Sequence, residues 1–136
     1  MTHLSFYNTV AKKSECRKYT VDKLAAIRAV DPYSVLVAVN DDGTVVGFCF
    51  NHFDDYTIWL DWFAVRPDFR RKGVGGAFIE AVVETARKRG AHKVWCDTRA
   101  SNEPSMKLLR KSGFRKIAEV KRHWYKQDFI LWEKFT

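Results

Sequence analysis

The stretch Val65-Arg-Pro-Asp-Phe-Arg70-Arg-Lys-Gly73-Val-Gly75-Gly-Ala77 lies between an apolar run that predicts a strand and a periodic run that predicts a helix. Glycine lets the backbone turn tightly and approach a ligand, and the first turn of a helix presents amide groups with a partial positive charge. The segment therefore predicts a phosphate site. Its expected residues are Arg70, Arg71, Lys72, Gly73, Val74, Gly75 and Gly76.

Two familiar phosphate loops do not match this segment. A nucleotide P-loop needs a Lys-Ser/Thr pair after its glycines, and a dinucleotide fingerprint needs a third glycine where Phe78 stands. The alternative is a solvated turn that carries basic residues by chance.

The chain before the segment predicts one helix and three strands. A helical pattern begins at Thr20 and ends before Pro32, and the pair Asp42-Gly43 is a strong hairpin signal. The three strands are expected to form an antiparallel meander, over Tyr33–Asn40, Thr44–Phe53 and Tyr56–Val65.

The chain after the segment alternates helices and strands. The expected elements are a helix over Ala77–Arg89, a strand over His92–Thr98, a helix over Asn102–Lys111, and strands over Phe114–Val120 and Phe129–Lys134. The fold class is therefore α/β, with a mixed sheet whose central strand–helix–strand unit is parallel and right-handed.

Length and charge limit the class of protein. A chain of 136 residues is expected to be a single domain over 1–136. It has 24 Lys and Arg against 16 Asp and Glu, a net charge of +8 that favours phosphates, nucleic acid or acidic partners. The three cysteines are scattered, which predicts a reducing compartment and no metal site. The sequence shows no signal-peptide pattern and no long apolar run, so we expect a cytoplasmic protein without a membrane span.

Two motifs resemble those of one known family. Arg70-x-x-Gly73-x-Gly75, after a strand that ends Phe63-Ala64-Val65, resembles the acetyl-coenzyme A loop of the GNAT N-acetyltransferases. Asn102-x-x-Ser105-x-x-Leu108-x-x-Lys111-x-Gly113-Phe114 is similar to the helix-and-strand motif that follows that loop in the family. The two motifs stand in the family's order and spacing.

The resemblance implies a fold, a substrate and its binding residues. It implies the GNAT acyltransferase fold, acetyl-CoA as co-substrate without a metal, and a primary amine as acceptor. Phe63, Ala64 and Val65 would hold the pantetheine arm, and residues 70–76 would bind the pyrophosphate. Asn102 and Ser105 would contact the arm from the next loop and helix.

The resemblance is incomplete at the group that protonates the leaving thiolate. The family often has a tyrosine where this chain has Leu109, and Tyr125 is the expected substitute. Asp61 is the expected base, because alternation places it on one strand face with Trp59 and Phe63. The alternatives are a structural aromatic residue at Tyr125 and a salt bridge to Arg or Lys at Asp61.

Weaker candidates remain beside these. His52 and His123 are secondary candidates for the base, and the pair Asp54-Asp55 is a candidate for attracting a cationic amine. Trp124 and Trp132 are candidates for a homodimer contact or for the core.

The sequence leaves three functions open. The first is an N-acetyltransferase that acts on a protein N-terminus, a lysine or a small amine. The second is a GNAT-fold module that binds acyl-coenzyme A without turnover. The third is a basic protein that binds nucleic acid; for the enzyme, contact with RNA is expected only through a ribosomal or nucleoprotein substrate.

Overall fold

The computed structural model describes residue 26 and residues 29–136. Ala26, Ala29 and Val30 are helical, in agreement with the helix expected before Pro32. The remainder of that helix, Cys16 and the strand considered over residues 4–7 lie outside the described residues.

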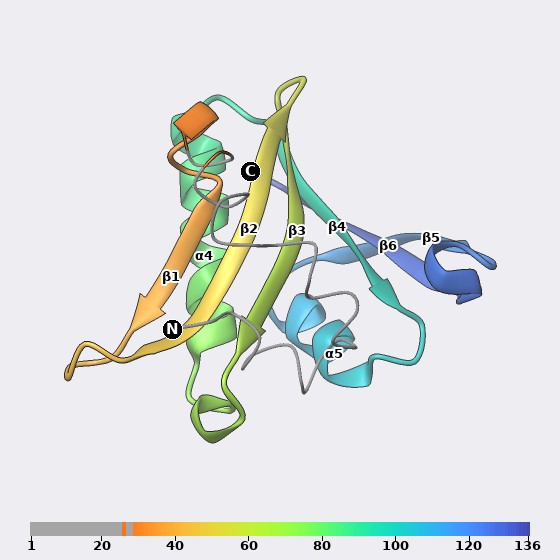
Figure 1. The fold of residues 1–136 in the computed structure, drawn as a ribbon. Coiled ribbons are helices and arrows are strands. Elements are labelled where there is room, and N and C mark those ends of the chain that lie inside the picture. Colours follow the sequence, from red (N-terminus) through yellow and green to blue (C-terminus); the bar gives the residue numbers. More distant parts are fainter. Residues whose placement is uncertain (1–25, 27–28) are drawn as a thin grey trace. The chain divides into compact units, whose positions relative to one another are not determined.

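The described elements follow the predicted order (Figure 1). The strands are β1 (Val35–Val39), β2 (Val45–Asp54), β3 (Thr57–Val65), β4 (Lys93–Arg99), β5 (Arg115–Val120) and β6 (Phe129–Phe135). The helices are α4 (Val74–Lys88) and α5 (Glu103–Lys111), with short 3-10 turns η1 (Pro67–Phe69) and η2 (Trp124–Lys126).

One mixed sheet contains the six strands in the order β1-β2-β3-β4-β6-β5. β3 and β4 run parallel, with Thr57–Trp59 opposite Lys93–Trp95, and this confirms the predicted parallel pair. β1 and β2 are antiparallel across the expected turn, in which the Gly43 N–H donates to the Asn40 carbonyl (3.0 Å). The α/β fold class is therefore confirmed.

The chain divides into two compact units. The first ends at His52 and resumes over Asp61–Phe78, and the second comprises Phe53–Leu60 and Ile79–Thr136. Each unit is described by itself.

In the first unit, the core forms where β2 and β3 place apolar side chains on one face. Phe48, Phe50 and Ala64 are buried together, with Trp62 packed against them. The Phe48 and Phe50 rings stack with centroids 4.7 Å apart. Since side chains alternate along a strand, Asp61 and Phe63 point to the face opposite Trp62.

Gly47 is required for close packing in this core. A Cβ atom at this position would lie 2.9 Å from both the Ala64 carbonyl oxygen and Phe78 Cε2. We expect Gly47→Ala to lower the free energy of unfolding by about 1–3 kcal/mol, because one of the two neighbours is backbone and must shift. Urea denaturation measures the change.

Gly76→Ala is the matched comparison for Gly47→Ala. Its Cβ would meet nothing within 4 Å, and the residue is helical. This variant is expected to gain about 0.5–1 kcal/mol from the better helix propensity of alanine. Equal stability of the two variants would contradict the packing role of Gly47.

In the second unit, a buried charge network joins three strands. The Glu133 carboxylate on β6 accepts from Lys93 Nζ on β4 (3.2 Å) and from Arg115 Nε (2.9 Å) and a terminal nitrogen (2.7 Å) on β5. The Arg115 hydrogen bond, followed by that from Lys93, lowers the pKa of Glu133 against the opposing effect of burial. The network fixes the β4-β6-β5 register at one point.

Helix α5 packs on β6 in the same unit. The Arg110 guanidinium lies 5.3 Å from the centroid of Trp132, and Lys134 Nζ donates to the Ser112 carbonyl (2.8 Å). Trp132 is buried, and its indole N–H donates to Thr98 Oγ1 (2.9 Å). Trp132 is therefore a core residue, which removes it from the candidates for a dimer contact.

Candidate active site

The predicted phosphate segment, residues 65–77, connects β3 and α4 in the first unit and is called the phosphate segment below. After β3 ends at Val65, the chain makes the η1 turn, and Arg71 and Gly73 adopt φ angles of 60° and 83°. The sequence placed the helix start at Ala77, and that boundary was wrong: α4 begins at Val74. Gly75 and Gly76 thus belong to the first helical turn, where the backbone N–H groups have no intrahelical acceptor.

The first turn of α4 has amides available for a ligand. The Ala77 N–H makes the first helical bond, to the Gly73 carbonyl (3.0 Å), so the amides of Val74, Gly75 and Gly76 have no intrahelical acceptor. This turn contains no acidic residue to offset the helix dipole. A Cβ atom at Gly73 or Gly76 would meet nothing within 4 Å. These features fit an anion such as a diphosphate.

Cations accompany this turn. Arg70 Nε donates to the Val65 carbonyl (3.1 Å), which ties the arginine to the end of β3. Lys72 Nζ and the Arg66 guanidinium lie 5.2 and 5.7 Å from the centroid of the Phe69 ring. The side chains of this segment thus contact one another and the end of β3, and Arg70, Arg71 and Lys72 are exposed.

The expected base Asp61 has a histidine as a partner. Its Oδ2 lies 2.8 Å from His52 Nδ1, so the carboxylate pairs with one of the two weaker histidine candidates. The β2–β3 hairpin, which turns at Asp55 and Tyr56, brings the two residues together. The sequence analysis named both residues without pairing them. Both lie a few residues from the turn, which indicates that they can meet across the hairpin.

The Asp61 charge also reaches a buried thiol. Burial, followed by the Asp61 charge, raises the pKa of Cys49 to about 12. Cys49 is fully buried and therefore has no nucleophilic role.

In the second unit, Asn102 and Ser105 begin helix α5. Asn102 Oδ1 accepts from the Ser105 N–H (3.3 Å), so this asparagine is the N-cap of the helix. Leu109, at the position where the related family often has tyrosine, is buried in the core.

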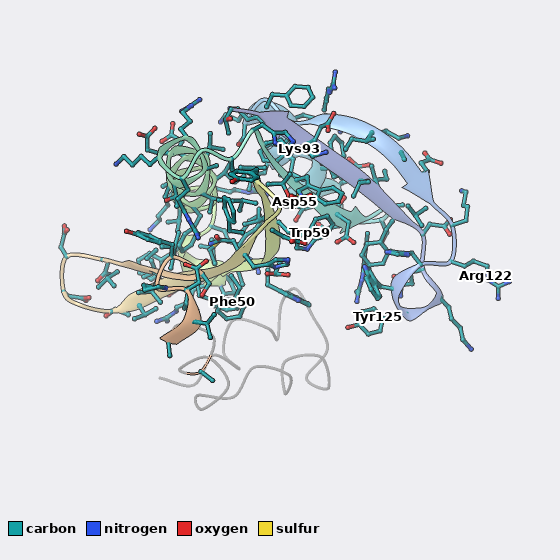
Figure 2. The ribbon with its side chains drawn as sticks, turned by 90° about the horizontal axis from the view of Figure 1, so that it is seen from above. Phe50, Asp55, Trp59, Lys93, Arg122 and Tyr125 are labelled. Carbon is teal, nitrogen blue, oxygen red and sulfur yellow. The ribbon has the colours of Figure 1, made fainter. Side chains whose placement is uncertain are left out.

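The loop between β5 and β6 carries Tyr125 and contacts Asp97 of β4, an aspartate that the sequence analysis did not single out. Tyr125 is about half exposed, and the Arg99 guanidinium lies 5.6 Å from its ring centroid (Figure 2). Next to it, the Trp124 indole N–H donates to Asp97 Oδ2 on β4 (2.8 Å). Burial raises the pKa of Asp97, against the opposing hydrogen bond from Trp124 and the charge of His123.

A signal for Asp97 was present in the sequence. β4 reads Lys-Val-Trp-Cys-Asp-Thr-Arg, and the carboxylate interrupts its apolar centre next to a buried cysteine. A charged residue held in a half-buried strand position with a raised pKa is typical of groups that transfer protons.

The remaining candidates are exposed. Asp54 is the last residue of β2 and Asp55 begins the β2–β3 turn, where Figure 2 labels it. In residues 26 and 29–136, no three His, Cys, Asp or Glu side chains gather as metal ligands would. No helix in this same part of the chain is long and apolar enough to cross a bilayer.

Among curated proteins, one relative matches less than half of this chain and another matches most of it. The [ribosomal protein bS18]-alanine N-acetyltransferase of Escherichia coli K12 is 37% identical over 62 residues, which are 46% of this chain and 41% of that protein. The aligned part thus spans less than half of that relative. The aminoglycoside N(6′)-acetyltransferase type 1 of Klebsiella aerogenes is 31% identical over 117 residues, 80% of this chain and 74% of that protein.

Solved structures share the fold. Ard1 from Thermoplasma volcanium superposes with a TM-score of 0.78 at 24% identity, over 87% of this chain and 80% of that one. The ribosomal-protein-S18-alanine N-acetyltransferase from Escherichia coli gives 0.68 at 19% identity, over 86% and 90%. The acetyltransferase (GNAT) family model matches residues 3–114. The chain belongs to the GNAT acetyltransferase family.

Proposed function

We propose that the whole chain, as one domain, is an N-acetyltransferase that moves an acetyl group from acetyl-CoA to a primary amine. The observation that carries the proposal is the first turn of α4, whose amides follow a cationic segment and face no acidic residue. A helix start without acidic residues in its first turn binds phosphate groups well.

The donor would be held mainly by the first unit. The diphosphate would lie against residues 70–76, with the Val74, Gly75 and Gly76 amides as donors. The backbone of Phe63, Ala64 and Val65, at the end of β3, would pair with the pantetheine arm. Asn102 and Ser105 would contribute from the start of α5, with Asn102 offering its amide nitrogen because its oxygen caps the helix.

The reaction would need two proton movements. The amine nitrogen attacks the acetyl carbon, a C–N bond forms, the C–S bond breaks, and the amine loses one proton while the thiolate gains one. These movements start from the neutral amine. A free alkyl amine has a pKa of about 10.4 and is mostly protonated near neutral pH, so a base must also remove one proton from the ammonium form before the nitrogen can attack.

Two carboxylates are candidates for the base. Asp61 is paired with His52, and together they can relay a proton to solvent. Asp97 has a raised pKa because of burial, and a carboxylate shifted toward neutral pH accepts protons more effectively. We favour Asp97 on this ground.

Tyr125 is proposed as the group that protonates the leaving thiolate, because Leu109 has no proton to give. We expect Tyr125→Phe to lower kcat by about 10- to 100-fold, in the range typical of a lost general acid. Acetyl-CoA affinity should stay within twofold of the wild-type value, as measured by calorimetry. Unchanged kcat would return Tyr125 to a structural role.

The acceptor is proposed to be a primary amine. The relatives are named for acetylation of an alanine of ribosomal protein bS18 and of the 6′ nitrogen of aminoglycosides. A peptide N-terminus is the first acceptor to test, and an aminoglycoside is the second.

The test has two steps. Calorimetry with acetyl-CoA is expected to give micromolar binding, and turnover is then measured over a panel of N-terminal peptides, lysine peptides, polyamines and aminoglycosides. Binding without turnover over the whole panel would favour the non-catalytic module, which the buried Leu109 supports. No binding would reject both, and RNA binding would then be tested.

A further inference from the structure

The loop between β5 and β6 has an unusual backbone. Arg122, Tyr125 and Lys126 have φ angles of 48°, 56° and 58°, in the left-handed region that residues with side chains seldom adopt. The loop is tied by the Arg122 N–H, which donates to Asp128 Oδ1 (3.0 Å), and by the His123 N–H, which donates to the Gln127 carbonyl (2.7 Å). Such conformations persist where surrounding contacts enforce them, and they cluster at functional sites.

These contacts place the Trp124 indole against Asp97. The Trp124 ring is about half exposed, yet its N–H donates to Asp97 Oδ2 (2.8 Å). The His123 ring lies 4.4 Å from the Trp124 ring and 5.8 Å from the Phe129 ring, between centroids, and supports the indole from the β6 side. The indole thus has a defined position although it lies at the surface.

The other charged groups near this carboxylate have partners of their own. Arg99, two residues along the same face of β4, lies over the Tyr125 ring. Lys93, on the same face in the other direction, pairs with Glu133, which also accepts from Arg115. Among the described residues, His123 also acts on Asp97, and its charge lowers the pKa of that carboxyl.

We propose that Trp124 is a positioning residue whose indole N–H holds the Asp97 carboxylate in one orientation, in which it takes a proton from the acceptor amine. The inference rests on the proposed function, which supplies the acceptor amine. The effect of the hydrogen bond on Asp97 can be tested without turnover. The proton that leaves the amine goes to Asp97, and the indole proton stays on Trp124.

The direction of the effect follows from the hydrogen bond. A donor to the ionised carboxylate lowers its pKa, and burial raises it. Removal of the donor leaves burial unopposed by Trp124, so the pKa of Asp97 must rise. More of the base is then protonated at acidic pH, so kcat/KM falls on the acidic limb of its pH profile.

The experiment is a titration of the Asp97 side-chain carbon by NMR in the full-length protein, in wild type and in Trp124→Phe. Asp97→Asn identifies the signal. Trp124→Phe keeps a ring and removes the donor, and we expect the midpoint to rise by about one pH unit. The acidic limb of the kcat/KM profile should move by the same amount in the same direction.

Lys121→Met is the matched control. Lys121 lies in the same loop and pairs with Asp128 (3.3 Å) rather than with Asp97, so its loss should leave the Asp97 midpoint in place. An unchanged midpoint in Trp124→Phe, or an equal shift in Lys121→Met, would overturn the proposal. If the wild type has no turnover with any amine, the proposed function fails, while the NMR midpoints still decide whether Trp124 controls Asp97.

Discussion

Gly75→Glu is expected to weaken acetyl-CoA binding by about 100-fold, because a carboxylate in the first turn of α4 would stand where we propose that the diphosphate binds. A repulsion of this size corresponds to roughly 3 kcal/mol, which two like charges at close range in a partly buried site can supply. Calorimetry measures the dissociation constant directly.

The same substitution should not harm the fold. Glutamate is favourable at a helix start, where it interacts with the dipole, and it replaces a glycine that is poor for helix formation. We therefore expect Tm to stay equal or rise while affinity falls. This opposite response separates lost binding from lost structure.

Ala81→Glu provides the matched control for this charge. Ala81 is exposed on the same helix, beyond its first turn. The control should bind acetyl-CoA within about twofold of the wild type, since exposed charges at a distance are screened by salt. Comparable losses in the two variants would mean that the effect is one of net charge and not of position.

Asp97→Asn is expected to lower kcat by about 100- to 1000-fold with acetyl-CoA affinity unchanged. The amide oxygen can still accept from the Trp124 indole, so the loop contact survives, but the side chain no longer accepts a proton. General-base catalysis typically contributes about 10²–10⁴ to the rate. Steady-state kinetics over pH 5–9, with calorimetry for the donor, measure both quantities.

Asp61→Asn is the companion to Asp97→Asn. If Asp97 is the base, loss of the Asp61 charge should lower kcat by less than about tenfold, within the range of indirect electrostatic effects. The reverse order, with Asp61 more important than Asp97, would assign the base to the His52–Asp61 pair and contradict our preference.

The sequence predicted the element order because each element has a clear local cause. Asp42-Gly43 fits a hairpin turn, Gly113 ends α5 with φ of 89°, and Asn102 begins it as an N-cap. The start of α4 was placed three residues late, because glycine was taken as a loop residue. Tertiary contacts can outweigh the low helix propensity of glycine at such boundaries.

The site was harder to predict than the fold. The phosphate segment is continuous in the chain, so residues 70–76 could be predicted from their glycines, their cations and their place before a helix. The pairs His52–Asp61 and Trp124–Asp97 join residues 9 and 27 positions apart, and depend on strand register and loop conformation. Asp97 was missed because a lone carboxylate in a strand has no motif, and its raised pKa arises from burial.

A crystal structure with acetyl-CoA bound is the most direct measurement of the central claim. We predict that the diphosphate oxygens accept hydrogen bonds from the Val74, Gly75 and Gly76 amides at the start of α4, with the Arg70–Lys72 side chains around them. A diphosphate bound elsewhere, with these amides in contact only with water, would contradict it.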